Sequence, residues 1–167
     1  MNIFYVNTDP VLSAQDLPDK LVVKMPLESA QMLSTTQRYY YDADYCDACD
    51  IYKTAYLNHP CTIWARESAD NYNWLYRHFV ALCEEYTYRY GKVHASDTKL
   101  RRVLSRIPLS IPDLGLTTIA QAMPDQYKDS DPVMAYRNYL INEKHYAEWN
   151  KNRAKPNWWV KPVRKCA

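Results

Sequence analysis

A run of apolar side chains that recur every three or four residues occupies positions 67 to 90 and is the strongest pattern in the sequence. Its members are Tyr72, Leu75, Phe79, Leu82, Cys83, Tyr86 and Tyr90. This spacing places them on one face of a helix, and Gly91, directly after the last member, is the residue type that most often follows a helix end. The pattern predicts a helix over 67–90 with one buried face, against which the rest of the chain must pack.

A second long helix is predicted from about residue 20 to 40, with Asp19 as its N-terminal cap. An arc of about 80° on this helix holds the polar side chains Lys20, Lys24, Glu28, Gln31, Thr35 and Arg38. The opposite side, which we expect to be buried, holds Val22, Met25, Ser29, Ala30, Met32 and Leu33. Pro26 removes one backbone hydrogen bond and crowds the carbonyl of Val22, so it predicts a bend beside Glu28.

Shorter helices are predicted over 96–105 and from Pro132 to about Lys151, and a helical turn is predicted from Pro10. The candidate caps are Thr8 or Asp9 before Pro10, Asn58 or His59 before Pro60, Ser68 or Asp70 before the 67–90 helix, and Ser96 before the next one.

The remaining segments show no helical period. Residues 2–7 suit a short edge strand or an extended arm, 41–58 an irregular loop, and 107–132 a connection that wraps the surface. A chain of 167 residues is long enough for one hydrophobic core and needs no second one. The predicted fold class is mainly α, a compact single-domain helical bundle with long irregular loops that comprises residues 1–167.

Composition excludes several classes of protein. The chain has only two glycines, Gly91 and Gly115, which excludes glycine-rich phosphate loops and dinucleotide-binding fingerprints. No apolar run has the length of a membrane span, and the N-terminus lacks the features of a signal peptide, so a cytoplasmic protein without a membrane partner is expected. Sixteen tyrosines and five tryptophans provide rings with a polar edge, which suit stacking on nucleic-acid bases as well as core packing.

Charge is distributed unevenly along the chain. From Lys151 onward there are six cations and no acid, whereas residues 1–150 hold the other 15 of the 21 cations and all 19 acids. A basic, tryptophan-bearing tail on a mildly acidic body suits binding to a polyanion, although a tail that only increases solubility would show the same count. We expect this tail, residues 151–167, to pack on the domain or extend from it.

Cysteine and histidine residues suggest two alternative sites. Cys46, Cys49, His59 and Cys61 include the donor types of a zinc site, but the last two are too close together for usual zinc-finger spacing. Cys61 with His59 or His78 is a candidate for nucleophilic catalysis, although no oxyanion-hole loop is recognisable. Trp64, Arg66 and Asn71 are candidates to line a pocket.

Two separated stretches, LPDKLVVKMPLESAQML and NEKHYAEWNKNRAKPNWWVKPVRKCA, resemble the T4 endonuclease V family of pyrimidine dimer DNA glycosylases and AP lyases. The long helix ending in EEYTYRYGKVH lies where that family has its central helix. The resemblance covers most of the chain in order at low identity, and residues 41–61 differ.

The resemblance implies an all-helical enzyme, without a cofactor, that binds and kinks double-stranded DNA and displaces a base near the lesion. The family's amino-terminal amine attacks the sugar C1′ with the help of a glutamate, which implies catalytic roles for Glu28 and, beside it, Met1 or Asn2. A carboxylate among cations stays ionised and can stabilise positive charge at C1′. The implied DNA-binding residues are Lys20, Lys24, Arg38, Arg137, Lys144, Trp158, Trp159 and Lys161.

The amino terminus departs from the family, which exposes a small residue's amine after removal of methionine, whereas Asn2 follows Met1 here. Hydrolytic glycosylase chemistry, without lyase activity, is therefore an alternative. Two other readings are a non-catalytic nucleic-acid or protein-binding module, with or without zinc, and a phage enzyme that modifies free nucleotides. For the enzyme we expect a monomer, encoded by a phage and active in the host cytoplasm.

Overall fold

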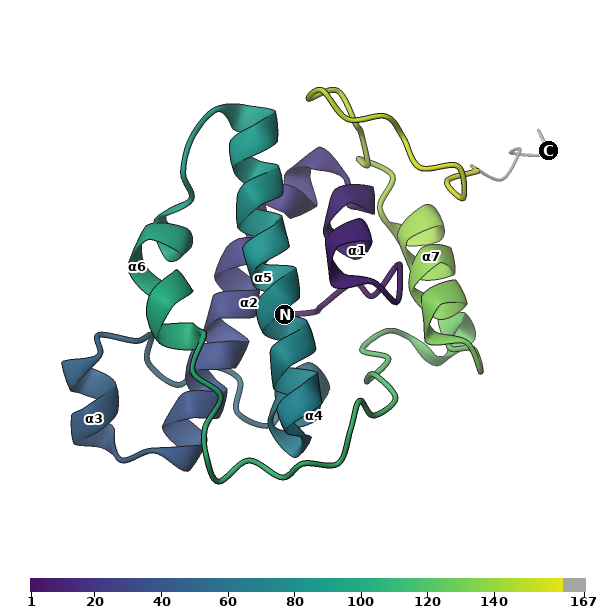
Figure 1. Ribbon diagram of the computed structural model, residues 1–167. Helices are drawn as coiled ribbons and strands as arrows, with labels where there is room; N and C mark the ends of the chain where they lie inside the picture. The colour runs from purple at the N-terminus through teal and green to yellow at the C-terminus, as the bar shows by residue number, and fades with distance from the viewer. Residues whose placement is uncertain (161–167) are drawn as a thin grey trace.

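Two helices of 22 residues, α2 (Asp19–Tyr40) and α5 (Ala69–Tyr90), pack against each other and form the centre of the molecule (Figure 1). The structure, a computed structural model, describes residues 1–160. The other helices are α1 (Pro10–Asp16), α3 (Ala43–Ala48), α4 (Pro60–Glu67), α6 (Ala95–Leu104), the short 3-10 helix η1 (Asp125–Tyr127) and α7 (Pro132–Glu143). Residues 1–160 contain no strand, and the predicted mainly α fold is confirmed.

Both long helices were predicted close to their observed bounds. Gly91 ends α5 with a φ of 65°, which is the left-handed backbone that favours glycine. The apolar members of α5 from Tyr72 to Cys83 are buried, as is the expected face of α2 around Met25 and Leu33. Asp9 and His59 cap α1 and α4 as predicted, each accepting a backbone N–H with its side chain.

The last helix is shorter than its apolar pattern predicts. Residues up to Lys151 were expected to be helical, but α7 ends at Glu143. Beyond it the chain pairs with the junction of α1 and α2, because the Glu148 carbonyl accepts the Asp19 N–H at 2.9 Å and the Trp149 indole donates to the Asp16 carbonyl at 3.1 Å. These long-range hydrogen bonds replace those that further helical turns would provide.

Other local predictions were wrong. The 41–58 segment contains α3, whose first turn is capped by the Asp42 carboxylate. His94, not Ser96, caps α6. Asp19 is the first residue of α2 and gives its side chain no capping hydrogen bond, because its carboxylate accepts from the Arg89 guanidinium and the Asn150 N–H.

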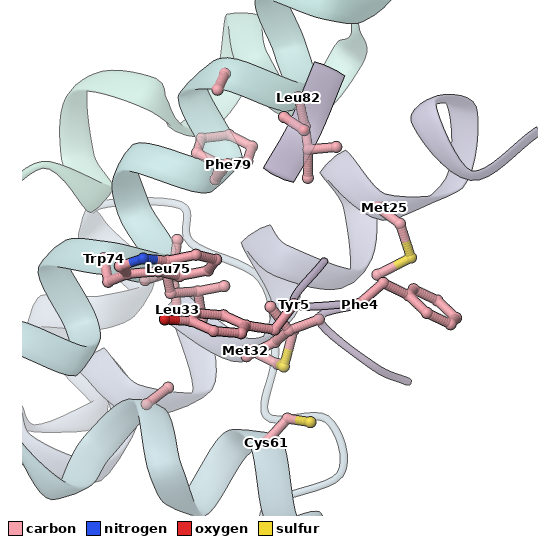
Figure 2. Packing of buried hydrophobic residues seen from close by; sticks show 14 of the residues in the cluster. Phe4, Tyr5, Met25, Met32, Leu33, Cys61, Trp74, Leu75, Phe79 and Leu82 are labelled. Carbon is pink, nitrogen blue, oxygen red and sulfur yellow. The ribbon is translucent and has the colours of Figure 1, made fainter. Parts of the chain in front are cut away.

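The segment before α1, which was predicted to form a short edge strand or an extended arm, forms no strand and is buried. Residues 3–6 are buried in the core, and Figure 2 shows Tyr5 beneath Trp74 of α5 and Phe4 beside Met25 of α2. Phe4 has a φ of 57°, a conformation that a bulky residue adopts only when its surroundings impose it. The chain start is therefore held inside the fold instead of fraying from it.

The connection from α6 to α7 wraps the molecule as predicted and runs along the lower edge in Figure 1. Trp64 and Asn71, which were candidates to line a pocket, bind this connection through the carbonyl and hydroxyl of Thr117. The third candidate, Arg66, donates to the Leu57 carbonyl and lies over the Tyr39 ring. All three side chains therefore have structural contacts. Within residues 1–160, no helix combines the length and apolar character that crossing a membrane requires.

The Arg89 guanidinium links α5 to the end of α1 and the start of α2 inside the protein. It donates to the Glu85 and Asp19 carboxylates at 2.6 and 2.9 Å and to the carbonyls of Leu17 and Gln15. Glu85 also accepts two hydrogen bonds from Arg153 of the tail. Because Arg89 and Glu85 are both buried, each charge depends on these partners.

Replacing Arg89 by methionine is expected to lower the free energy of unfolding by about 3–5 kcal/mol, since the substitution leaves the buried Asp19 carboxylate without a cation and the buried Glu85 carboxylate with Arg153 alone. Urea denaturation measures the change. Arg77→Met, on the exposed face of the same helix, serves as the control and should change stability by less than about 0.5 kcal/mol. Equal stability of the two variants would contradict the structural role of Arg89.

His78 is expected to make the protein less stable in mild acid. Its Nδ1 lies 2.9 Å from the Pro10 carbonyl, Nε2 has no partner, and burial lowers the pKa of His78 to about 4. Because the unfolded chain binds the proton near pH 6.5, this residue's contribution is present above that pH and decreases by about 3 kcal/mol as the pH falls to 4. His78→Gln keeps a donor for the carbonyl and should remove that part of the pH dependence in denaturation curves at pH 7 and 4.

Candidate active site

Glu28 lies against the amino terminus in the middle of α2. Its Oε2 accepts the Asn2 backbone N–H at 3.1 Å and lies 3.9 Å from the α-amino nitrogen of Met1. The residue is only 9% exposed, so its carboxylate is largely screened from solvent. A buried carboxylate and a primary amine are thus adjacent, although they lie 27 positions apart in the sequence.

The Asn2 side chain holds the first residues in this position. Its amide Nδ2 donates to the Ala122 carbonyl at 2.8 Å, while Oδ1 accepts the Ile3 N–H at 2.8 Å. The Cys61 thiol lies 3.9 Å from the same oxygen. Asn2 is buried and its polar side-chain atoms are occupied, so its side chain orients the neighbouring groups and is not free to react.

Met1 is anchored by its side chain and open at its main chain. The side chain is 1% exposed, and the Thr62 hydroxyl lies 3.5 Å from its sulfur. The residue as a whole is partly exposed, so the exposed area belongs to the main-chain atoms that include the amine. Thr62 lies in the first turn of α4, so this turn packs against the Met1 side chain. His59, which caps α4, lies near the amino terminus: burial, and after it the charge of the amino terminus, lowers the pKa of His59.

Lys24 lies on the solvent side of the carboxylate. Its Nζ is 2.9 Å from Glu28 Oε1, and this hydrogen bond raises the pKa of Lys24. The lysine side chain is 62% exposed, so it remains accessible to an anion from solution. The two carboxylate oxygens are therefore divided between a lysine ammonium and the amino-terminal backbone.

A group of cations and aromatic rings borders Glu28 on the side of α7. The Lys20 ammonium lies 5.1 Å from the centre of the Tyr146 ring, and Lys144 lies 5.1 Å from the centre of the Tyr139 ring. Tyr139 stacks in parallel on Phe4, two residues after Asn2. Of the predicted DNA-binding residues, the structure thus brings Lys20, Lys24 and Lys144 to the region around Glu28.

Other predicted DNA-binding residues lie elsewhere. Arg38, near the far end of α2, binds the Tyr52 and Ile51 carbonyls and Asp47, so it holds the α3 segment in place. Arg137 donates to the Val6 carbonyl and lies over Trp158, whose indole donates to Asp16. Through these contacts, Arg137 and Trp158 help to pack the described part of the tail against the rest of the protein.

Trp159 is buried against Trp149 and Trp158 and belongs to the hydrophobic core. Lys161, the remaining predicted phosphate-binding residue, lies outside the described residues.

The cysteine alternatives find no support in this geometry. Across residues 1–160, no three His, Cys, Asp or Glu side chains gather in a group that could hold a metal ion. Cys46 lies in α3, and Cys49 directly follows this helix. Cys61 lies in α4 and contacts Asn2, while the His59 side chain accepts the Cys61 N–H as the cap of α4. Burial raises the pKa of the Cys61 thiol to about 11, which keeps it protonated near neutral pH.

Several residues that shape this site carry no recognisable signal in the sequence. Thr62, the Ala122 carbonyl and Tyr139 act through contacts with residues far away in sequence, and no spacing or motif marks them. His59 was noticed for its cysteine neighbours and as a cap, but not for its position near the amine. A contact map would have been required to find them.

Comparison with known proteins identifies the family to which the chain is related. No curated protein and no solved structure shows a significant match to the chain. The family model described as pyrimidine dimer DNA glycosylase matches residues 1–99, which include Met1, Asn2, Lys24 and Glu28. Since that match covers more than half of the chain, the protein belongs to the pyrimidine dimer DNA glycosylase family.

Proposed function

We propose that this protein is a base-excision enzyme that cleaves the N-glycosidic bond of a damaged pyrimidine in double-stranded DNA. The observation that carries the proposal is the contact of the buried Glu28 carboxylate with the Met1 amine, 3.9 Å away, and the Asn2 N–H. Family membership supports DNA as the substrate. We further propose that residues 1–167 act as one domain and as a monomer.

In the proposed reaction, the neutral α-amine of Met1 attacks C1′ of the damaged nucleotide. The C1′–N bond breaks, and the base leaves with the bonding electrons and takes up a proton. Glu28 stabilises the positive charge that develops at C1′ and accepts the proton that the attacking nitrogen loses. The C1′–O4′ bond then breaks and O4′ takes up a proton, which opens the sugar and leaves an iminium ion between C1′ and the Met1 nitrogen. Loss of a proton from C2′ permits β-elimination of the 3′ phosphate, which is the AP lyase step.

The geometry favours the Met1 amine over the other nucleophiles near Glu28. Lys24 is closer to the carboxylate, but their hydrogen bond raises the pKa of Lys24 and keeps the lysine charged. Cys61 is buried and protonated. The amine is held by the buried Met1 side chain, which reduces the entropy lost when it meets a substrate.

Three lysines on one side of the carboxylate supply the charge that a DNA backbone requires. Lys20 and Lys24 lie on α2 and are well exposed, and Lys144 directly follows the end of α7. Their positions support phosphate contacts around the reacting nucleotide. Binding should therefore weaken strongly as the salt concentration rises.

Glu28→Gln is expected to lower base release from a duplex containing a cyclobutane pyrimidine dimer by at least roughly 100-fold, because the amide cannot accept a proton or carry the stabilising charge. Glu67→Gln, an exposed acid on α4, is the control and should keep full activity. Gel-based cleavage and DNA binding are measured together. Full activity of Glu28→Gln would exclude this carboxylate from the mechanism.

Borohydride reduction of the reaction mixture separates the two chemical routes. With the Met1 amine as nucleophile, reduction of the iminium ion yields a stable protein–DNA adduct, and peptide mapping should place it on residue 1. Base release without any adduct would instead indicate attack by water. An adduct on Lys24 would overturn the assignment of the nucleophile.

A further inference from the structure

We propose that a hollow between α3 and α6 is a binding site for a small anion that carries phosphate groups. Its volume of about 480 Å³ lies within the range of roughly 300–1,000 Å³ that is usual for small-molecule sites. The side of α6 contributes the cations Lys99, Arg102 and Arg106, and the side of α3 contributes Ala48 and Cys49. Figure 1 shows α6 on the opposite side of the α2–α5 pair from α7, so this site is separate from the Glu28 site and goes beyond the proposed function.

Two of the three cations in the hollow are left without an acidic partner. Lys99 pairs with the Asp50 carboxylate at 2.9 Å. Within residues 1–160, no acid pairs with Arg102 or Arg106, and neither guanidinium donates a hydrogen bond, although both residues are exposed. Because the three cations line one hollow, their charges repel one another, and an anion between them would remove that repulsion.

The end of α6 does not need these guanidinium groups. Basic side chains near a helix C-terminus often bind its last carbonyls, which have no partner inside the helix. In α6 other side chains already donate to these four carbonyls: Tyr76 to Arg101, Ser105 to Arg102, Gln37 to Val103, and Tyr72 to Leu104. Arg102 and Arg106 therefore remain available to a ligand, on a backbone that α2 and α5 hold in place.

The charge and geometry of the lining groups suit phosphate. A guanidinium presents paired N–H donors that match two oxygens of a phosphate group, and an ammonium adds a compact positive charge. Three cations against the single Asp50 carboxylate leave two positive charges, which suits an anion with at least two negative charges. Since the Lys99–Asp50 pair is exposed and contributes little to stability, Lys99 can turn to the anion at small cost.

The α3 side of the hollow disfavours a long polyanion. Asp44 and Asp47 lie in α3, Asp50 follows it, and all three residues are exposed. Duplex DNA that lay across both sides would bring its phosphates against these carboxylates, whereas a small anion can contact the α6 side alone. The distribution of charge therefore favours a phosphorylated small molecule over DNA as the ligand.

The test is isothermal titration calorimetry with inorganic pyrophosphate at pH 7 and constant ionic strength. The unchanged protein should bind one pyrophosphate with a dissociation constant below about 1 mM, and Arg102→Gln/Arg106→Gln should weaken binding by roughly tenfold or more. Arg77→Gln/Lys92→Gln removes the same charge from exposed positions outside the hollow and should bind as the unchanged protein does. Absence of binding below 1 mM, or an equal effect of the two double variants, would overturn the site.

Cys49 provides a local readout of occupancy. It lines the hollow and is half-buried, whereas the neighbouring Cys46 is buried. Saturating pyrophosphate should slow alkylation of Cys49 by iodoacetamide, followed by peptide mass spectrometry, by roughly threefold or more. Unchanged alkylation despite binding would place the anion elsewhere and overturn the assignment.

Duplex DNA separates this proposal from the proposed function. Arg102→Gln/Arg106→Gln should leave duplex binding and base release unchanged, and Glu28→Gln should keep pyrophosphate binding. If the double variant instead weakened duplex binding, and a short duplex displaced pyrophosphate, the hollow would belong to a DNA-binding surface and the small-anion site would be overturned. Failure of base release in the unchanged protein would overturn only the glycosylase activity.

Discussion

The buried Arg89 guanidinium is the contact on which the arrangement of the long helices depends. It donates hydrogen bonds to the carboxylates of Glu85 and Asp19 and to two backbone carbonyls at the end of α1. These bonds determine where α2 begins relative to α5. Burying a guanidinium is costly unless its donors find partners, which makes other registers of α2 unfavourable. Glu28 lies nine residues after Asp19, about 13 Å along the helix, so its position follows from this register.

The same network determines where the chain goes after α7. Arg153 binds Glu85, and the Asn150 N–H binds Asp19, so the segment after α7 returns to the start of α2 instead of extending into solvent. This path places Lys144 and Tyr146 beside the polar side of α2. The fold thus positions one border of the candidate site through charges that are themselves remote from the site.

Local signals in the sequence predicted the helices well, and long-range contacts account for most errors. The period of three and four and the Gly91 end identified α5, and Pro10 and Pro60 marked two helix starts. Asp19 was assigned as a cap because nothing local reveals that Arg89, 70 residues later, takes its carboxylate. The end of α7 was misplaced for the same reason, since its competing hydrogen bonds come from residues more than 125 positions earlier.

In the candidate site, too, local signals in the sequence identified some residues, whereas long-range contacts could not be predicted. Glu28 was singled out as the one acid on a basic stripe, and the family resemblance supplied its expected partner. No pattern indicated that residues 3–6 would be buried, or that the Asn2 amide would reach the Ala122 carbonyl across 120 positions. Arg38 shares the stripe with Lys20 and Lys24, but it lies near the other end of α2 and is occupied by the α3 segment. A helical wheel shows which residues share a face and not which of them share a site.

The position of the Glu28 carboxylate depends more on the amino terminus than on Lys24. An ion pair between residues four apart on an exposed helix face contributes only about 0.3–0.5 kcal/mol, and the Lys24 side chain is 62% exposed. The hydrogen bond from the Asn2 N–H is buried, and the Asn2 side chain is itself held by Ala122 and Cys61. The carboxylate is thus oriented by the same segment that carries the amine, so any change that loosens residues 1–4 would separate both groups at once.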